Sequence, residues 1–133
     1  MKHYLLDTNI CIFYMKGKFN LDQRLGELSP TRCFISEITL AELKFGAENS
    51  ADPTRHRQVV SNFLTGVQLL PIIDALDVFA REKARLRRAG TPLDDFDLLI
   101  GATAVAHQLT LVTNNIRHLA RLADIHVEDW TVV

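Results

Sequence analysis

The sequence predicts an α/β fold, a three-layer α/β/α sandwich in which helices cover both faces of a short, mostly parallel sheet. Short apolar runs alternate along the chain with longer segments of 3.6-residue periodicity, which favours alternating strands and helices. The short runs are apolar throughout, as expected of parallel strands buried on both faces. With 133 residues and no internal repeat or linker, the chain is expected to form one domain over residues 1–133.

Three strands and four helices are predicted in the first half of the chain. The strands are the short apolar runs at Tyr4–Leu6, Cys33–Ser36 and Val67–Leu70. The helices are expected at about Ile10–Met15, Leu21–Leu28, Thr39–Glu48 and Arg55–Thr65. Ser29-Pro30 ends the second of these helices, and the turn "SADPT" separates the last two.

The second half is expected to hold three helices and two strands. Asp74 is predicted to cap a long helix that runs to Arg88 and stops at Ala89-Gly90. The remaining elements are a strongly apolar helix at about Asp95–Gln108, a buried strand at Leu109–Thr113, a helix near Arg117–Leu122 and a short closing strand in "IHVEDW".

Composition excludes several classes of protein. A net charge of −1 gives no bulk attraction to nucleic acid or membrane, so any basic binding surface must be local. Cys11, Cys33 and the five histidines show no zinc-site spacing. No signal-peptide pattern is present, and no segment approaches the roughly 18 apolar residues needed to cross a bilayer. A cytoplasmic protein without a membrane partner is expected.

Polar side chains follow the predicted strands at the points where the strands end. Asp7 comes directly after the first strand, and Asn114 and Asn115 come directly after "LTLVT". Glu42 lies about one turn into the helix after "CFIS", and Asp97 lies in the first turn of the apolar helix. Ligands of open parallel sheets bind beyond the carboxyl ends of the strands. These side chains are therefore expected to meet at one edge of the sheet.

Each polar residue also has a purely structural interpretation. Asp7 could only cap the next helix, and Thr39 with Glu42 fits a capping box if that helix begins at Thr39. Asp97 could simply face the positive end of its helix behind an Asp94 cap, and Asn115 could occupy a tight turn.

The joint pattern favours a metal site. Three converging carboxylates raise one another's pKa, and the neighbouring strands offer no Lys or Arg partner. A divalent cation resolves this conflict, and an all-oxygen set of ligands favours Mg²⁺, with Mn²⁺ as a substitute.

Four segments in this order resemble the motifs of PIN-domain ribonucleases, and of VapC toxins of VapBC toxin–antitoxin pairs in particular. The segments are "LLDTNICIFY", "SEITLAELKFGAE", "GTPLDDFDLLIGATA" and "LVTNNIRHL", and the "EDW" ending is similar too. The resemblance implies a PIN-like fold with Asp7, Glu42 and Asp97 as acidic metal-site residues. Asn115 is the fourth expected catalytic residue beside Asp7, Glu42 and Asp97, and it stands where many family members carry an acid. The expected supporting residues are Asn9, Thr113, Asn114 and Asp95.

The resemblance also implies an activity and partners. The expected activity is metal-dependent hydrolysis of RNA phosphodiester bonds, in tRNA or another structured RNA, which leaves a 5′-phosphate and inhibits translation. We expect Asp7 and Asp97 to bind the metal directly, and Glu42 to bind it directly, bind it through water or accept a proton. A homodimer and a VapB antitoxin whose tail lies across the active-site groove are the expected assemblies.

Contacts to RNA phosphates require local cations. Arg81, Arg85 and Arg88 recur at helical spacing in "REKARLRRAG", and Lys16 and Lys18 follow the first helix. A solvated helix face with Glu82 as partial compensation explains the arginines equally well.

Three other functions can be compared with the residues present. A phosphoacceptor signalling domain is disfavoured because "DTN" lacks an acidic pair, and a DxD phosphatase fails because residue 9 is Asn. A catalytically inactive PIN-like module that binds RNA or protein stays open, with Asn115 as the suspect substitution.

Overall fold

The computed structural model describes residues 1–132 and contains one five-stranded sheet in the order β3-β2-β1-β4-β5. The strands are β1 (Tyr4–Leu6), β2 (Cys33–Ser36), β3 (Gln68–Leu70), β4 (Thr110–Val112) and β5 (His126–Glu128). All four strand pairings are parallel. The predicted sandwich around a parallel sheet is confirmed, and β1 lies at the centre of that sheet.

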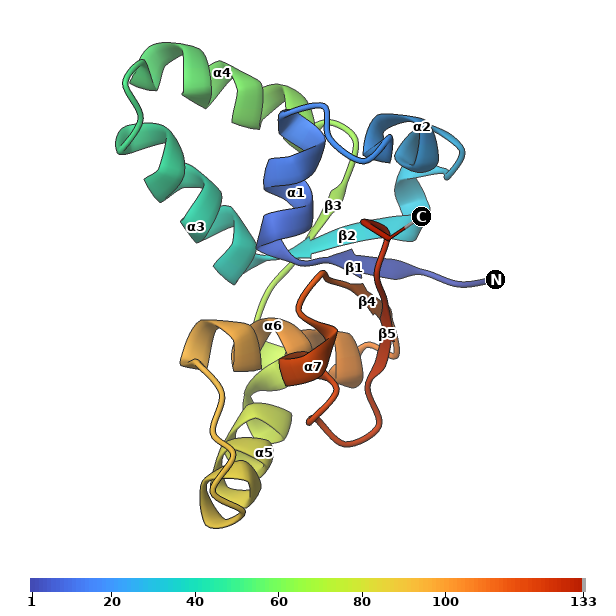
Figure 1. The fold of residues 1–133 in the computed structure, drawn as a ribbon, viewed down its shortest axis with the longest axis vertical. Coiled ribbons are helices and arrows are strands. Elements are labelled where there is room, and N and C mark those ends of the chain that lie inside the picture. Colours follow the sequence, from blue (N-terminus) through green and yellow to red (C-terminus); the bar gives the residue numbers. More distant parts are fainter. Residues whose placement is uncertain (133) are drawn as a thin grey trace.

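Helices cover both faces of the sheet (Figure 1). On one face lie α1 (Thr8–Met15), α2 (Leu21–Gly26), α3 (Glu37–Glu48) and α4 (Pro53–Leu64). On the other lie α5 (Leu76–Arg88), α6 (Asp95–Ala106) and α7 (Ile116–Leu119). Two 3₁₀ turns, Pro30–Arg32 and Ile73–Ala75, complete the chain. Among residues 1–132, no helix is long and apolar enough to cross a bilayer.

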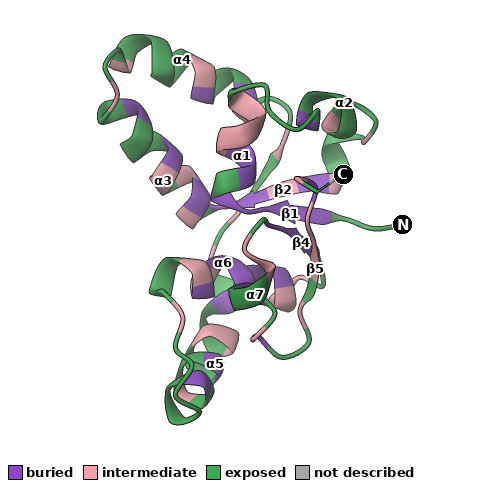
Figure 2. Cartoon of the chain, in the orientation of Figure 1, coloured by how far each residue is buried: buried purple, intermediate pink, exposed green. Residues whose placement is uncertain are grey.

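The sheet separates two apolar cores, because successive strand residues point to opposite faces. Leu6 of β1 packs with Ile10 of α1 and Leu43 of α3. Its neighbour Leu5 packs with Leu98 and the other apolar residues of α5, α6 and α7. Figure 2 shows β1 and β4 buried along their length. This two-sided burial explains why the strands read as unbroken apolar runs in the sequence.

Three helix starts were predicted too late along the chain, whereas α2 and α6 begin at the predicted Leu21 and Asp95. The helices α1, α3 and α4 each begin two residues before the predicted start, behind the caps Asp7, Ser36 and Asp52. Periodicity detects the residues that face the core, whereas the first turn is fixed by side chains that satisfy free backbone N–H groups. The predicted Asp74 cap of α5 is wrong, since Asp74 lies in the 3₁₀ turn and Ala75 precedes the helix.

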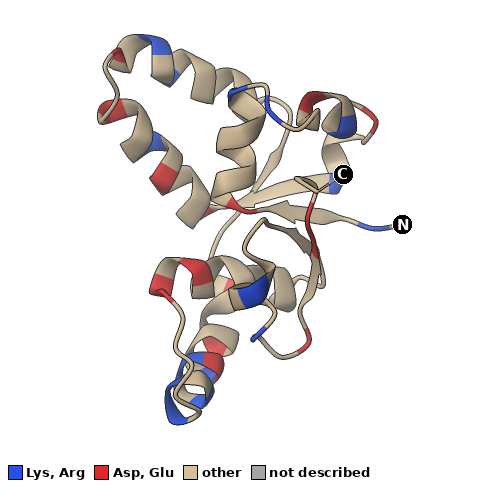
Figure 3. Ribbon diagram, viewed as in Figure 1, with Lys and Arg blue, Asp and Glu red and all other residues tan. Residues whose placement is uncertain are grey.

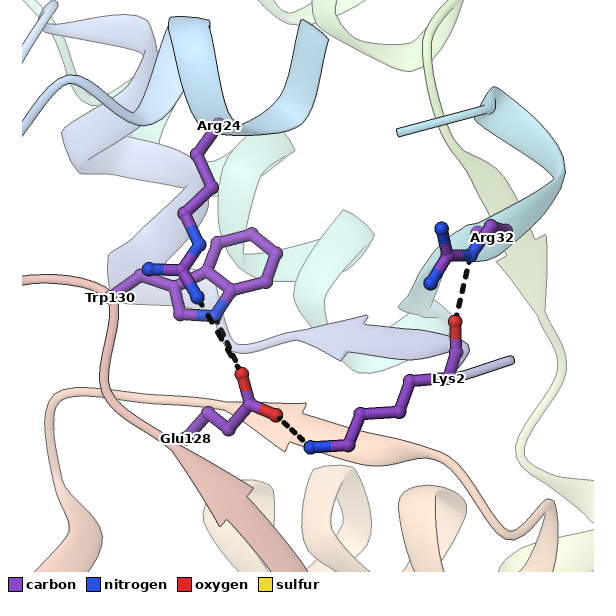
Figure 4. Close-up of polar contacts among 5 residues, drawn as sticks. All are labelled: Lys2, Arg24, Arg32, Glu128 and Trp130. Atoms are coloured by element: carbon purple, nitrogen blue, oxygen red, sulfur yellow. Dashed lines mark hydrogen bonds and ion pairs between the residues drawn. The ribbon is translucent and has the colours of Figure 1, made fainter. Parts of the chain in front are cut away.

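A C-terminal clasp, formed by Trp130 and Glu128, ties the end of the chain to its beginning (Figure 4). Trp130 is only 4% exposed and packs edge-on against Tyr4, with ring centroids 5.0 Å apart. The guanidinium of Arg24 from α2 stacks 4.5 Å from the indole. Glu128 accepts hydrogen bonds from Trp130 Nε1 at 3.0 Å and from Lys2 Nζ at 2.7 Å. The clasp therefore joins β5, β1 and α2.

Replacing Trp130 with alanine is expected to lower the free energy of unfolding by about 3–5 kcal/mol, because it leaves a cavity between Tyr4 and Arg24. Urea denaturation measures this. Trp130→Phe keeps an aromatic ring but loses the N–H donor to Glu128, so it is expected to cost less than alanine. The exposed Val132→Ala serves as the control. A loss below about 1 kcal/mol in Trp130→Ala would contradict the role of the clasp.

Candidate active site

A pocket opens at the carboxyl ends of the central strands, where the sequence places its acids. Its volume is about 390 Å³, and it is lined by Asp7, Thr8, Asn9, Glu42, Asp97, Asn114 and Asn115. Figure 3 shows acidic segments in red at the end of β1 and at the start of α6, which face this edge from two sides. The structure thus brings together residues that lie 90 positions apart in sequence (Asp7 and Asp97).

Asp7 is the buried carboxylate of the pocket, with only 6% of its surface exposed. Its Oδ1 accepts a hydrogen bond from Thr8 N at 2.8 Å, and its Oδ2 accepts one from Thr113 Oγ1 at 2.8 Å. Its own backbone N–H donates to Val112 O at 2.9 Å. Burial raises the pKa of Asp7 above its ordinary value, and the two hydrogen bonds only partly offset this. Each carboxylate oxygen keeps an unused acceptor position.

Glu42 is held by the hydroxyl of Thr8, which also contacts the hydroxyl of Thr39. Thr8 Oγ1 donates to Glu42 Oε1 at 2.7 Å and lies 3.0 Å from the hydroxyl oxygen of the buried Thr39. These contacts fix the first turns of α1 and α3 against each other. The capping-box interpretation of Thr39 and Glu42 is wrong, because α3 begins at Glu37 behind Ser36, whose side chain accepts from Ile38 N.

Asp97 is half-buried in the first turn of α6, behind Asp94, which accepts from Phe96 N at 3.1 Å. Burial raises the pKa of Asp97 to about 6, and the negative charges of Asp7, Asp94 and Glu42 add to the effect. Within residues 1–132, none of Asp7, Glu42 and Asp97 forms an ion pair with Lys, Arg or His. The pocket therefore holds negative charge that the protein itself leaves uncompensated.

The predicted supporting residues fall into two groups. Thr113, besides holding Asp7, accepts from Asn115 N at 3.0 Å, and the exposed Asn9 and Asn114 line the pocket. Asp95 is different: its carboxylate pairs with Lys83 of α5 at 2.9 Å, and it is absent from the pocket lining. The structure therefore places Asp95 outside the pocket that it was expected to support.

Sequence analysis missed His118, whose Nδ1 is hydrogen-bonded to Asn115 Oδ1. The three-residue spacing across one helical turn was the available signal. It also missed the contact between the Thr8 and Thr39 hydroxyls, which no local pattern reveals because the two residues lie on different helices.

Of the predicted RNA-contacting arginines, Arg85 has a structural role instead. Its Nε and Nη2 bind the buried Glu82 at 2.7 and 2.9 Å, and Nη2 also donates to Arg121 O at 2.7 Å. Glu82 in turn accepts from Ala123 N, so the pair fastens the segment after α7 to α5. A guanidinium neutralised in this way is a poor phosphate ligand.

The remaining predicted cations do not form one basic surface. Arg81 and Arg88 lie on α5, whereas Lys16 and Lys18 follow α1 on the opposite face of the sheet (Figure 1). Figure 3 shows basic residues gathered at the end of α5, away from the acidic start of α6. Any contact of these four residues with RNA stays a prediction.

A second, mostly apolar cavity of about 450 Å³ adjoins the acidic pocket through Glu42. It lies between α1, α3 and α4, and we call it the helical groove. Its lining residues are Ile12, Met15, Lys16, Glu42, Leu43, Gly46, Ala47, Arg55, His56, Val59 and Val60. Its two cations, Lys16 and Arg55, form no ion pair within residues 1–132.

The donor set of the acidic pocket fits a hard divalent cation. Its side chains offer only oxygen ligands and amides, and its carboxylates have no cationic partner among residues 1–132. However, no three His, Cys, Asp or Glu side chains within residues 1–132 are spaced to hold a metal ion together. The predicted set of three direct metal ligands, Asp7, Glu42 and Asp97, is therefore not seen as one cluster. One or two carboxylates with water and phosphate oxygens suit Mg²⁺.

Comparison with known proteins matches residues 4–125 to the PIN domain family. The chain is 37% identical over 131 residues to the "tRNA(fMet)-specific endonuclease VapC" of Salmonella typhimurium, covering 98% of this chain and 99% of that protein. It is 34% identical to "Ribonuclease VapC2" of Haemophilus influenzae, covering 98% and 99%.

Two solved structures are similar over nearly the whole chain. The DNA-bound VapBC complex of Salmonella typhimurium contains a chain with a TM-score of 0.91 and 38% identity, covering 98% of this chain and 99% of that one. VapBC2 of Rickettsia felis, bound to a promoter DNA fragment, contains one with a TM-score of 0.89 and 30% identity, covering 96% and 98%.

Removing the Thr113 hydroxyl is expected to destabilise the protein, because buried Asp7 loses a hydrogen-bond donor. Thr113→Val keeps the shape of the side chain, so the free energy of unfolding should fall by about 1–3 kcal/mol in urea denaturation. The buried Thr103→Val is the matched control, since its hydroxyl donates only to a backbone carbonyl of its own helix, Leu99 O. An equal loss in both variants would contradict a special role for Thr113.

The metal-free protein is expected to lose stability as pH rises through about 6. The pKa of Asp97 is about 6 in the folded protein, against an ordinary value of 3.8. The folded state therefore binds this proton more tightly than the unfolded state does, and the resulting stability is fully present only below pH 3.8. That contribution disappears as Asp97 ionises. In EDTA at pH 7.5, Asp97→Asn should melt a few degrees above the wild type, and the gap should shrink toward pH 4. A melting temperature of Asp97→Asn equal to the wild type at pH 7.5 would refute this.

Proposed function

Since the chain belongs to the PIN-domain family, we propose that it is a Mg²⁺-dependent endoribonuclease, the toxin of a VapBC toxin–antitoxin pair, which hydrolyses RNA phosphodiester bonds and inhibits translation. Its full-length similarity to named VapC ribonucleases makes it a nuclease of that type. One observation supports the chemistry: three carboxylates line one pocket, and none of them pairs with a cation in the described part of the chain. The relatives support catalysis and not the alternative of an inactive binding module.

The residues of the pocket have separate roles in the proposed hydrolysis. Asp7 and Asp97 would hold the metal ion, with Thr113 and the Thr8 N–H fixing the Asp7 carboxylate. When bound, the ion would lower the pKa of a water molecule and neutralise charge on the scissile phosphate. Glu42 accepts from Thr8 through Oε1, which leaves its Oε2 to orient the attacking water and accept its proton.

Transfer RNA is the substrate class that we propose. The similar protein from Salmonella typhimurium is named a tRNA(fMet)-specific endonuclease, and its similarity covers nearly all of both chains. The open acidic pocket, with exposed Asn9 and Asn114 at its edge, would admit a backbone phosphate of a folded RNA.

A VapB-type antitoxin is the expected partner, as in the similar VapBC complexes. We propose that its tail lies in the helical groove, whose apolar floor ends at Glu42. An arginine at the end of that tail would reach the pocket, where a guanidinium matches carboxylate geometry and would exclude the metal ion. Exposed Phe45 and Ile73 support a homodimer, and the toxin would act in the cytoplasm.

The variant Asp7→Asn tests the proposed activity. With Mg²⁺, the wild type should cleave a tRNA pool, and Asp7→Asn should reduce the rate at least about 100-fold by weakening metal binding. Stability should change little, since the loss of one of the two hydrogen bonds that Asp7 accepts is offset by the removal of the uncompensated buried charge. The affinity for Mg²⁺ should rise between pH 5 and 7 as Asp97 loses its proton.

The matched control is Asp22→Asn, an exposed acid on α2 outside the pocket, which should cleave like the wild type. Full activity in Asp7→Asn, or cleavage undiminished by EDTA, would overturn the proposal.

A further inference from the structure

We propose that Asn115 binds the scissile phosphate through its amide N–H group instead of binding the metal, and that His118 is the positioning residue that orients this amide. The inference rests on the proposed function and adds a role for one residue in the same pocket. It concerns the position at which this chain carries a neutral amide beside three acids.

Asn115 is fixed at two points. Its backbone N–H donates to Thr113 Oγ1 at 3.0 Å, the same hydroxyl that donates to Asp7. Its side chain lines the pocket, and its Oδ1 is hydrogen-bonded to His118 Nδ1 on the exposed turn of α7. An amide oxygen only accepts hydrogen bonds, so His118 must carry a proton on Nδ1. With the oxygen engaged by the imidazole, the amide NH₂ is the group left for the pocket.

The charge of the pocket favours the same orientation. Asp7, Glu42 and Asp97 make the pocket negative, because none of them forms an ion pair within residues 1–132. A carbonyl oxygen turned toward these carboxylates would be repelled, whereas an NH₂ group would be attracted. The exposed imidazole is the complementary partner for the oxygen, since both its neutral Nδ1–H form and its charged form donate there.

An amide donor at this point suits phosphodiester hydrolysis. Negative charge develops on the nonbridging phosphate oxygens as the attacking water adds, and a fixed N–H donor stabilises that charge. A carboxylate in the same place would repel the phosphate unless a further cation were bound. Asn115 therefore lets the site act on phosphate while only Asp7 and Asp97 hold metal.

The experiment combines RNA cleavage with calorimetry of Mg²⁺ binding in the absence of RNA. Asn115→Ala should lower kcat/KM about 10- to 100-fold while changing the Kd for Mg²⁺ by less than about twofold. His118→Ala should lower kcat/KM about tenfold, and His118→Gln, which retains a side-chain N–H donor, should restore part of this loss. The double variant should be no slower than Asn115→Ala alone, because His118 acts through Asn115. The exposed His126→Ala is the matched control and should behave like the wild type.

Three results would overturn the inference while wild-type cleavage stands. A loss of Mg²⁺ affinity of about tenfold in Asn115→Ala would make the amide oxygen a metal ligand. Unchanged cleavage in Asn115→Ala would remove its contact with phosphate, and additive losses in the double variant would remove the positioning role of His118. Absence of cleavage by the wild type would instead overturn the proposed function, and the inference with it.

Discussion

The buried carboxylate of Asp7 is the constraint on which the architecture of the site depends. It sits at the end of the central strand β1, between strands β2 and β4, where removal from water is costly. Residues 1–132 offer it two hydrogen bonds, from Thr8 and Thr113, but no cation. The other acids of the pocket, Glu42 and Asp97, increase this cost. Positive charge from outside the chain, such as the proposed metal ion or the proposed guanidinium of an inhibitor, would offset this cost.

The same constraint relates catalysis to inhibition. The helical groove and the acidic pocket meet at Glu42, so a peptide that fills the groove has its end beside the carboxylates. The peptide supplies apolar contacts along α1, α3 and α4, and its end supplies charge. In this arrangement a partner would gain affinity from the groove and would gain its inhibitory effect from the pocket. Neither surface alone provides both.

The sequence was sufficient to predict the convergence of the acids, because parallel strands place their carboxyl ends at one edge. Asp7, Glu42 and Asp97 all line the pocket for this reason. Two of the strands, Tyr4–Leu6 and Cys33–Ser36, also have the predicted bounds. Some helix starts were harder to predict, because a cap such as Ser36 is recognised from backbone geometry and not from apolar periodicity. Side-chain pairings were the hardest to predict. The spacing of Arg85 and Glu82 in the sequence is compatible with a solvated helix face and equally with the buried ion pair that the structure contains.

The C-terminal clasp determines where both ends of the polypeptide emerge. Lys2 meets Glu128, and the pair lies at the side of the sheet away from the start of α6 (Figures 1 and 4). A reporter, affinity tag or immobilising surface joined at either end would therefore lie away from the acidic pocket. Because the two ends are neighbours, a short peptide could join them and new termini could be opened in a surface loop. The resulting circularly permuted enzyme could serve as a sensor.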